Sequence, residues 1–418
     1  MRRLLGTTTA ALSSAALVLT MAACSGGDPA EAVEDGGSST LKVWVMGDAG
    51  PAFTDLTAAF TEDTGIKLQV DAIPWENVND KLTTAVASGD GPDVVQIGLS
   101  LLPTFADAGV LADLTDVLAE HPALAPSNFP DAVAPENLST DGVALSVPWV
   151  SDTRVLFYRS DILAEAGHDA APTTWEDMRS VAKELAQRGE GQFGYYIPLW
   201  DNTLPVQYTW QAGGDVVDAE GAVDFRSPEF AAAADHWLGF FEDGSAPTAT
   251  DWDQTQGFVS GATPMVVSGP YLAKAIRDAA PELDGSWSVT TLPADQTGTS
   301  LFAGSNLGIW KTSTHPDEAA QLLDFLAQPD NQVAWYDAVG ELPTSSAALT
   351  ELAGRGDEQL SVYVEQLDDA QTVPMVPGWD LVANEMASAL TAIATTAADK
   401  QSTLDAFYAK ADEIQSNY

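Results

Sequence analysis

The feature that most constrains the fold is a regular alternation of strand and helix patterns between Leu41 and Gly98. Apolar runs typical of strands alternate with amphipathic stretches typical of helices, in the order 41–47, 51–66, 67–73, 75–90 and 92–98. This alternation predicts an α/β fold with a mainly parallel sheet and helices on both faces. Ligands of such sheets bind beyond the carboxyl ends of the strands. We therefore expect Asp48, Asp71 and residues 96–100 at the candidate binding edge.

The later sequence continues to mix strands and helices. Thr174 and Asp177 form a capping-box-like arrangement at the start of a helix over 173–187. Other segments indicate two extended runs joined through Pro148 over 142–163, a strand, glycine turn and helix start over 262–276, a strand over 306–310, a helix over 315–330 and a largely helical C-terminal part. The strict alternation stops after three units, which argues against an eight-unit barrel.

The N-terminus is typical of an exported lipoprotein. Arg2 and Arg3 precede an almost uncharged run that ends at Ala23, the arrangement of a signal peptide over 1–23. The following Cys24 is the single cysteine of the 418-residue chain, and its surroundings resemble a bacterial lipobox, with Met21 in place of the usual Leu. We expect Cys24 to be acylated and residues 24–40, rich in Gly, Ser and acids, to form a flexible tether. An ordinary signal peptide with an incidental cysteine and an uncleaved membrane span are the alternatives.

Charge and composition limit the partners and exclude several kinds of site. Removal of the leader leaves 15 basic against 61 acidic side chains, a net charge of −46, which disfavours nucleic acid and anionic lipid headgroups. With one cysteine the chain has no disulfide. Its four histidines stand singly at 121, 168, 236 and 315 and show no metal-ligand spacing. We expect neither a metal nor another cofactor.

Five segments occur in an order that is similar to the extracellular solute-binding proteins of sugar ABC importers. They are "LKVWVMGDAGPAFTDLTAAFTEDTGIKLQV", "GDGPDVVQIGLSLLPTFADAGVLADLTD", "VPWVSDTRVLFYRSDIL", "GATPMVVSGPYLAKAI" and "DEAAQLLDFLAQPDNQVAW". The resemblance covers nearly all of 41–418. It implies a periplasmic-binding-protein-like fold in which two α/β lobes enclose a ligand cleft. The first lobe would comprise 41–148 plus 305–344 and the second 149–304 plus 345–418, with crossovers near Pro148, Ser305 and Pro343.

The resemblance also implies candidate sugar-binding residues. Sugar sites combine aromatic platforms for the apolar ring face with carboxylates and amides for the hydroxyl rim. The positions that match such residues are Asp48, Asp71, Asp152, Gln207 in place of a stacking tyrosine, nearby Trp210, Tyr271 and Trp379. Ala49 replaces a lysine of the maltodextrin-binding relatives and Ile97 a stacking tryptophan, so the ligand class carries over while maltodextrin itself does not. Residue type alone adds Trp75, Glu76, Trp200, Asp201, Trp252 and Asp253.

Each candidate also has a structural interpretation. Asp48 could cap a helix, Asp152 could pair with Arg154, and Tyr271 and Trp379 could be core residues. Trp44, Phe53 and Trp310 we assign to the core.

The sequence is compatible with several functions. The preferred one is a monomeric, lipid-anchored sugar-binding protein on the extracytoplasmic face of the cell membrane, which delivers its ligand to ABC permease subunits. The alternatives are a receptor for a polyol, phosphodiester or peptide, a secreted glycoside hydrolase with paired carboxylates, and a cell-surface adhesion lipoprotein. The sequence favours a binding protein over an enzyme, and no catalytic residue is predicted.

Overall fold

The computed structural model describes residues 39–129, 143–218, 221–249 and 252–418. The predicted signal peptide and Cys24 lie outside the described residues, as does the tether up to residue 38. Within the described ranges no helix is both long and apolar enough to cross a membrane.

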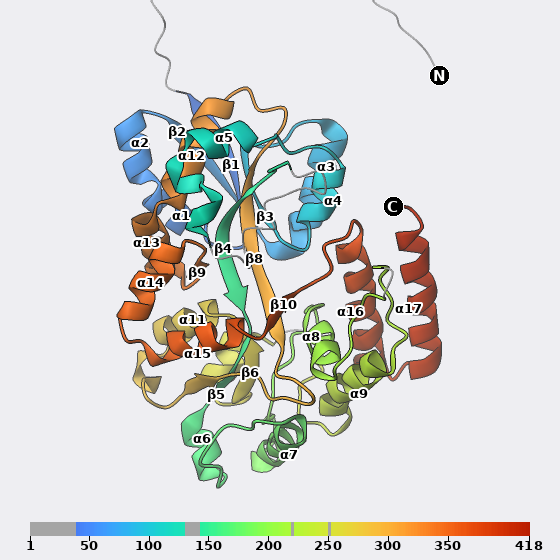
Figure 1. Cartoon of the computed structure of the whole chain (residues 1–418). Coiled ribbons are helices and arrows are strands. Elements are labelled where there is room, and N and C mark those ends of the chain that lie inside the picture. Colours follow the sequence, from blue (N-terminus) through green and yellow to red (C-terminus); the bar gives the residue numbers. More distant parts are fainter. Residues whose placement is uncertain (1–38, 130–142, 219–220, 250–251) are drawn as a thin grey trace, which may run out of the picture. The chain divides into compact units, whose positions relative to one another are not determined.

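A large sheet, which has seven strands in the described part of the chain, takes residues from both predicted lobes (Figure 1). The strand order is β2-β1-β3-β8-β4-β9, with β10 beside β8. The bounds are β1 (Thr40–Met46), β2 (Lys67–Ile73), β3 (Val94–Gly98), β4 (Val147–Thr153), β8 (Ser300–Ile309), β9 (Leu342–Pro343) and β10 (Ala370–Thr372).

The prediction of a mainly parallel sheet is correct for the strands that alternate with helices, and β10 also pairs in parallel with β8. β1 pairs in parallel with β2 and with β3, but β8 is antiparallel to both β3 and β4, and β4 is antiparallel to β9. The sheet is therefore mixed. The reason is that β8, β4 and β9 enter it from distant segments and not through short strand-helix-strand connections.

Helices cover both faces of the large sheet, as the alternation predicts. Val43 and Val45 of β1 pack into one core with Phe53, whereas Trp44 packs into another core with Trp310. Alternate residues of one strand point to opposite faces, so a strand that is apolar throughout needs cover on both sides. The core assignments of Trp44, Phe53 and Trp310 are confirmed. The helices of this part are α1 (Gly50–Leu56), α2 (Ala58–Thr64), α3 (Val78–Ser88), α4 (Leu102–Asp107), α5 (Thr115–Glu120), α12 (Pro316–Ala327) and α13 (Pro329–Val339).

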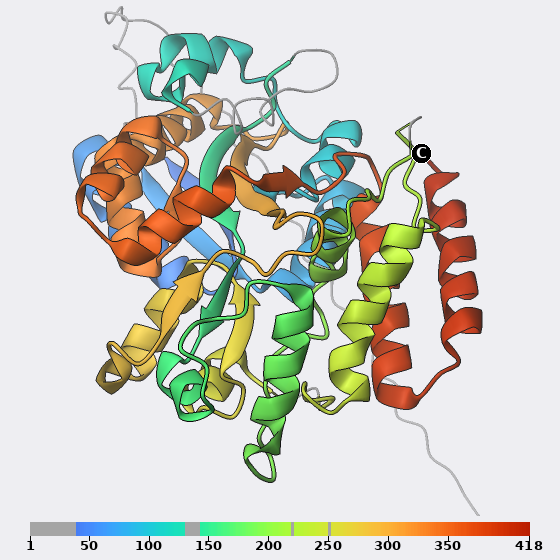
Figure 2. The same ribbon diagram turned by 60° about the horizontal axis from the view of Figure 1, so that its bottom comes forward.

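The second lobe contains a small antiparallel sheet in the order β6-β5-β7. The strands are β5 (Val155–Tyr158), β6 (Met265–Ser268) and β7 (Ser288–Thr290). The helices are α6 (Ser160–Glu165), α7 (Trp175–Leu185), α8 (Leu204–Gln211), α9 (Pro228–Glu242), α10 (Gln254–Val259), α11 (Tyr271–Ala279), α14 (Ser346–Gly354), α15 (Glu358–Leu367), α16 (Trp379–Thr396) and α17 (Lys400–Gln415). Figure 2 shows α16 and α17 beside α9. The predicted cap of α7 is confirmed, because the Thr174 hydroxyl accepts a hydrogen bond from the Asp177 N–H.

The three predicted crossovers lie on strands that neighbour one another. Pro148 is in β4, Ser305 in β8 and Pro343 in β9, and both Ser305 and Pro343 pair with Val150 of β4. A rotation of one lobe against the other at these residues would bend β8, β4 and β9 together. The hinge role of these residues and the lobe boundaries remain predictions.

Candidate ligand-binding site

The Trp75 side chain lies across the carboxyl ends of two strands. β1 is followed by Gly47 and β3 ends at Gly98. A Cβ placed on Gly47 would lie 3.0 Å from Trp75 Nε1, and one on Gly98 would lie 3.2 Å from Trp75 Cζ3. Glycine at both positions therefore lets the indole lie close to the sheet edge. Trp75 remains 49% exposed, so it offers an aromatic surface where ligands of such sheets bind.

Asp48 and Ile97 are the sequence neighbours of Gly47 and Gly98. Asp48 is exposed, but α1 is capped by Ala49 without a side-chain hydrogen bond, so the helix-cap alternative for Asp48 is wrong. Ile97, at the position of an expected stacking tryptophan, is a core residue. The exposed ring at this edge is Trp75 instead. The flanking glycines at 47 and 98 are the sequence signal that could have favoured Trp75.

Asp152 and Arg154 form an ion pair at the junction between the two sheets. Arg154 Nη1 lies 3.0 Å from Asp152 Oδ2 and donates a hydrogen bond to the Tyr271 hydroxyl oxygen at 3.3 Å. The Ser268 hydroxyl donates to the same Tyr271 oxygen at 3.1 Å. A Cβ on Gly269 would overlap Asp152 Oδ1, so this turn requires glycine. The predicted pairing of Asp152 with Arg154 is confirmed, and Arg154 is a site residue that sequence reasoning treated only as a structural partner.

In the described part of the chain, the ion pair of Asp152 and Arg154 leaves one acceptor atom and one donor atom without a hydrogen bond. Asp152 Oδ1 and Arg154 Nε are both buried and have no partner among the described residues. Buried polar atoms are seldom left unpaired, because each costs free energy. The arrangement is thus suited to accept a hydrogen bond at Asp152 Oδ1 from a ligand hydroxyl.

Burial and neighbouring carboxylates disfavour the charged form of the acids in this region. Burial raises the pKa of Asp152 against the opposing effect of Arg154, and the charge of Asp201 raises it further. Burial also raises the pKa of Glu341, to about 7. The hydrogen bond from Trp335 Nε1 lowers this pKa and the charge of Asp152 raises it. Glu341 directly precedes β9 and is a second acid of this region that sequence reasoning missed.

The strand register brings the Trp75 surface and Asp152 to the same part of the sheet. Gly98, beneath Trp75, pairs with Ser305 of β8, and Asp152 pairs with Ala303 of the same strand. The backbones of Gly98 and Asp152 are two strand spacings apart across the sheet and two residues apart along β8. This corresponds to a separation of about 12 Å.

Other candidates lie at the surface of the second lobe. Trp200 is 70% exposed, and the neighbouring Asp201 carboxylate accepts hydrogen bonds from the N–H and the hydroxyl of Thr203. Trp252 is half-buried against Phe193, with ring centroids 5.3 Å apart. Asp253 caps α10 by accepting from the Gln256 N–H at 2.8 Å, which gives it a structural role.

Three candidates are core residues. Gln207 is fully buried and accepts from the Leu301 N–H. Trp210 is 3% exposed, with Nε1 donating to Asp215, and Trp379 is 2% exposed and stacked on Phe225. These three side chains are at most 3% exposed, whereas the Asp152 side chain is 19% exposed. We therefore omit Gln207, Trp210 and Trp379 from the proposed site, although Gln207 Nε2 is also buried without a partner among the described residues.

Asp71 belongs to a different surface. It lies within β2 and lines a pocket of about 300 Å³ together with Lys42, Trp44 and Lys81. The Lys81 ammonium is 4.7 Å from the centre of the Trp44 ring. None of the other candidate residues lines this pocket. The side chain of Glu76 lies outside the described residues. Over the described ranges, no group of three His, Cys, Asp or Glu residues is placed to hold a metal ion.

The chain matches one family over most of its length. Residues 44–333 match the model of the bacterial extracellular solute-binding protein. The diacetylchitobiose binding protein of Streptomyces coelicolor is 26% identical over 391 residues, which are 90% of this chain and 90% of that protein. An uncharacterized lipoprotein of Streptomyces antibioticus is 30% identical over 364 residues, 82% of this chain and 77% of that protein.

A solved structure agrees with the sequence comparison. The sugar-binding protein MalE from Xanthomonas citri superposes with a TM-score of 0.77 at 27% identity, covering 91% of this chain and 98% of that one. The two-lobed arrangement and the long family match agree: this chain belongs to the bacterial extracellular solute-binding proteins.

Proposed function

We propose that this protein is a lipid-anchored receptor that binds a sugar, in the form of an oligosaccharide, between its two lobes and delivers it to an ABC permease. The observation that carries the proposal is the buried Oδ1 of Asp152, which lies beside Arg154 and Tyr271 and has no hydrogen-bond partner within the described ranges. A sugar hydroxyl supplies the missing donor, and a bond to a carboxylate is stronger than one to a neutral acceptor. The names of the similar diacetylchitobiose binding protein and of MalE support the same ligand class.

The proposed binding residues divide between the lobes. Trp75 offers a stacking surface on the first lobe, and Asp48 directly follows Gly47, which lies against that ring. Tyr271 begins α11 of the second lobe, and Asp152 lies on β4 between them. A ligand that touches both sides stabilises the closed arrangement only if it binds that arrangement better than the open one. Trp200 and Trp252 are outer candidates for further sugar rings, and Asp253 for their hydroxyls.

The anchoring and the lobe boundaries are parts of the same proposal. Acylated Cys24 and the tether would hold a monomeric receptor at the extracytoplasmic face of the membrane, near its permease. The lobes would comprise 41–148 plus 305–344 and 149–304 plus 345–418, so that ligand closure turns on β4, β8 and β9.

A thermal-shift screen of mono- and oligosaccharides tests the ligand class. A bound sugar raises the unfolding temperature by mass action, and analysis of the sugars afterwards distinguishes a receptor from a hydrolase. Stabilisation by an intact oligosaccharide supports the proposal. Stabilisation only by polyols, phosphodiesters or peptides would replace the sugar with another solute. Cleaved sugar would indicate the hydrolase, and no stabilisation by any solute would favour an adhesion protein.

A further inference from the structure

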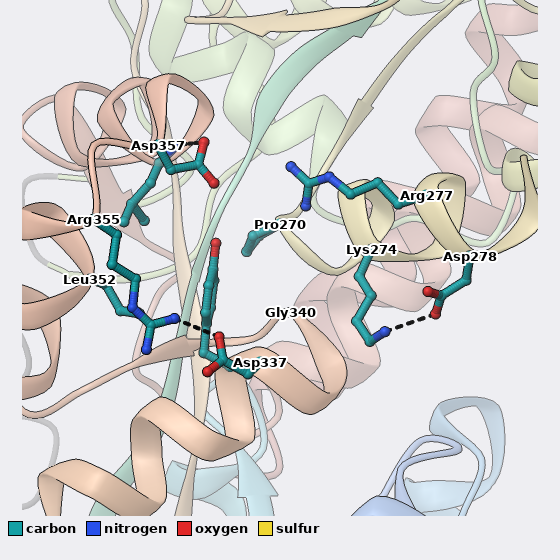
Figure 3. Close-up of a pocket in the computed structure, with 11 residues that line it drawn as sticks. Pro270, Lys274, Arg277, Asp278, Asp337, Gly340, Leu352, Arg355 and Asp357 are labelled. Carbon is teal, nitrogen blue, oxygen red and sulfur yellow. Dashed lines mark hydrogen bonds and ion pairs between the residues drawn. The ribbon is translucent and has the colours of Figure 1, made fainter. Parts of the chain in front are cut away.

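A second pocket, which neither Asp152 nor Trp75 lines, contains three basic and three acidic side chains. It has a volume of about 320 Å³ and is lined by α11, by α13 with its C-terminal Gly340, and by the segment from α14 to α15. We call it the α11–α15 pocket. Figure 3 shows Lys274 and Arg277 extending from α11 on one side and Arg355 on the opposite side. Because the lining also includes Asp278, Asp337 and Asp357, an anion can bind there only where a cation is not already neutralised.

The three cations differ in how far they are neutralised. The Lys274 ammonium pairs with Asp278 at 2.9 Å, and the Arg355 guanidinium pairs with Asp337 at 2.6 Å and with Glu351 at 3.2 Å. The Arg277 guanidinium donates to the neutral Gln359 amide oxygen and lies 5.8 Å from the centre of the Trp287 ring. Among the described residues Arg277 has no carboxylate partner.

The remaining acid of the pocket is already engaged. The Asp357 carboxylate caps α15 by accepting from the N–H groups of Gln359 and Leu360 at 2.8 and 3.4 Å. An acceptor held at a helix N-terminus in this way is satisfied by the helix itself. Arg277 is therefore the cation of the pocket that is most available to pair with a bound anion.

We propose that the α11–α15 pocket binds a small oxyanion of the phosphate type, either free or as part of a phosphorylated sugar. A guanidinium matches two oxygens of such a group at once, and an ammonium adds a point charge. Lys274 and Arg355 are partly exposed, and their surface ion pairs contribute little stability, so both can turn toward a bound anion. The anion would be held by Arg277 and Lys274 from one side and by Arg355 from the other.

This site is additional to the proposed sugar site, although the two share a wall. A Cβ on Gly340 would lie 3.2 Å from Lys274 Cβ and 3.4 Å from Tyr271 Cα. The residues next to Gly340 and Pro270 of the pocket are Glu341 and Tyr271 of the sugar region. The oxyanion proposal does not depend on the identity of the sugar, so it is tested without sugar-receptor assays.

The test is calorimetric titration and thermal shift of the purified full chain with sodium phosphate, a hexose 6-phosphate, the unphosphorylated hexose and sodium chloride at matched ionic strength. We expect saturable binding of at least one phosphate compound, weakened at least about fivefold in Arg277→Gln. Arg226→Gln is the matched control, because Arg226 pairs with Asp224 and Asp412 outside the pocket, and it should bind normally. Lys274→Gln gives a second variant if Arg277→Gln is poorly folded, and the same weakening is expected.

The outcomes are distinct. Equal affinity for phosphate and hexose phosphate identifies the free anion as ligand, and clearly tighter hexose phosphate binding that is lost in Arg277→Gln identifies a phosphorylated sugar. No saturable binding beyond the sodium chloride effect would overturn the proposal. Binding that Arg277→Gln and Lys274→Gln leave unchanged would also overturn it.

Discussion

Arg154 pairs with Asp152 through one carboxylate oxygen, and the other, Oδ1, is buried and has no partner in the part of the chain that the structure describes. The same guanidinium nitrogen donates to the Tyr271 hydroxyl oxygen. Arg154 thereby fixes an acceptor and an aromatic ring relative to each other before ligand arrives. Such preorganisation lowers the entropic cost of binding.

Arg154→Gln should destabilise the protein, because it leaves the Asp152 carboxylate without its cation. We expect a loss of roughly 1–3 kcal/mol in the free energy of unfolding, less than for a fully buried pair since both side chains keep some contact with solvent. Urea denaturation measures this loss. The matched variants are Asp152→Asn and the double mutant, which should recover part of the loss. Strictly additive single-mutant effects would mean that the pair is not coupled.

Trp75→Ala should weaken sugar binding about tenfold, as expected for the loss of an aromatic contact, without a large loss of stability. Half of the ring is exposed, so few core contacts disappear. Calorimetry with the sugar found in the screen measures the affinity, and Trp75→Phe should retain most of it. Unaltered affinity in Trp75→Ala would remove this ring from the site.

The raised pKa of Glu341 predicts a pH dependence of stability with a definite sign. Its carboxyl has a pKa of about 7 in the folded chain against an ordinary value of 4.5. The folded state therefore binds more protons than the unfolded state between these values, and the stability contribution of protonated Glu341 is lost as pH rises through about 7.

Glu341→Gln isolates this effect from the titration of the other acids. Denaturation from pH 5 to pH 8 should show the wild type losing stability relative to Glu341→Gln as the pH rises. Parallel pH profiles of the two proteins would show that Glu341 has an ordinary pKa.

Cys24→Ser should release the protein from the membrane into the medium, because the acylated sulfur is the proposed anchor. Cell fractionation followed by immunoblotting measures the distribution. Sugar affinity should be unchanged, since Cys24 is the first residue of the tether and lies outside the proposed binding residues. A variant that stays in the membrane fraction would contradict the lipid anchor.

The sequence predicted the first three strands and their helices because the signals there are local. β1 is an apolar run, and the helices before β2 and β3 end at Gly65 and Gly89, both with positive φ. The antiparallel pairing of β8 with β3 and β4 was not predictable in this way. It depends on segments that are far apart in the sequence.

The site was predicted less completely, because residue type does not determine burial. Trp75, Trp210 and Trp379 are all tryptophans. Packing against Phe225 nevertheless buries Trp379, while two glycines leave Trp75 at the surface. Asp152 was identifiable from its place in the matched segment. Its unpartnered oxygen and the raised pKa of Glu341 result from tertiary contacts that no local pattern reveals.

Calorimetric titration of wild type, Asp152→Ala and Asp90→Ala with an oligosaccharide panel tests the central claim most directly. Asp90 is an exposed acid whose nearest cation, Lys42, is 3.9 Å away, so its variant controls for loss of charge. We predict saturable one-to-one binding of at least one intact oligosaccharide to the wild type and to Asp90→Ala, with affinity at least about tenfold weaker in folded Asp152→Ala. Equal affinity in all three proteins, or no sugar binding to the wild type, would contradict the account.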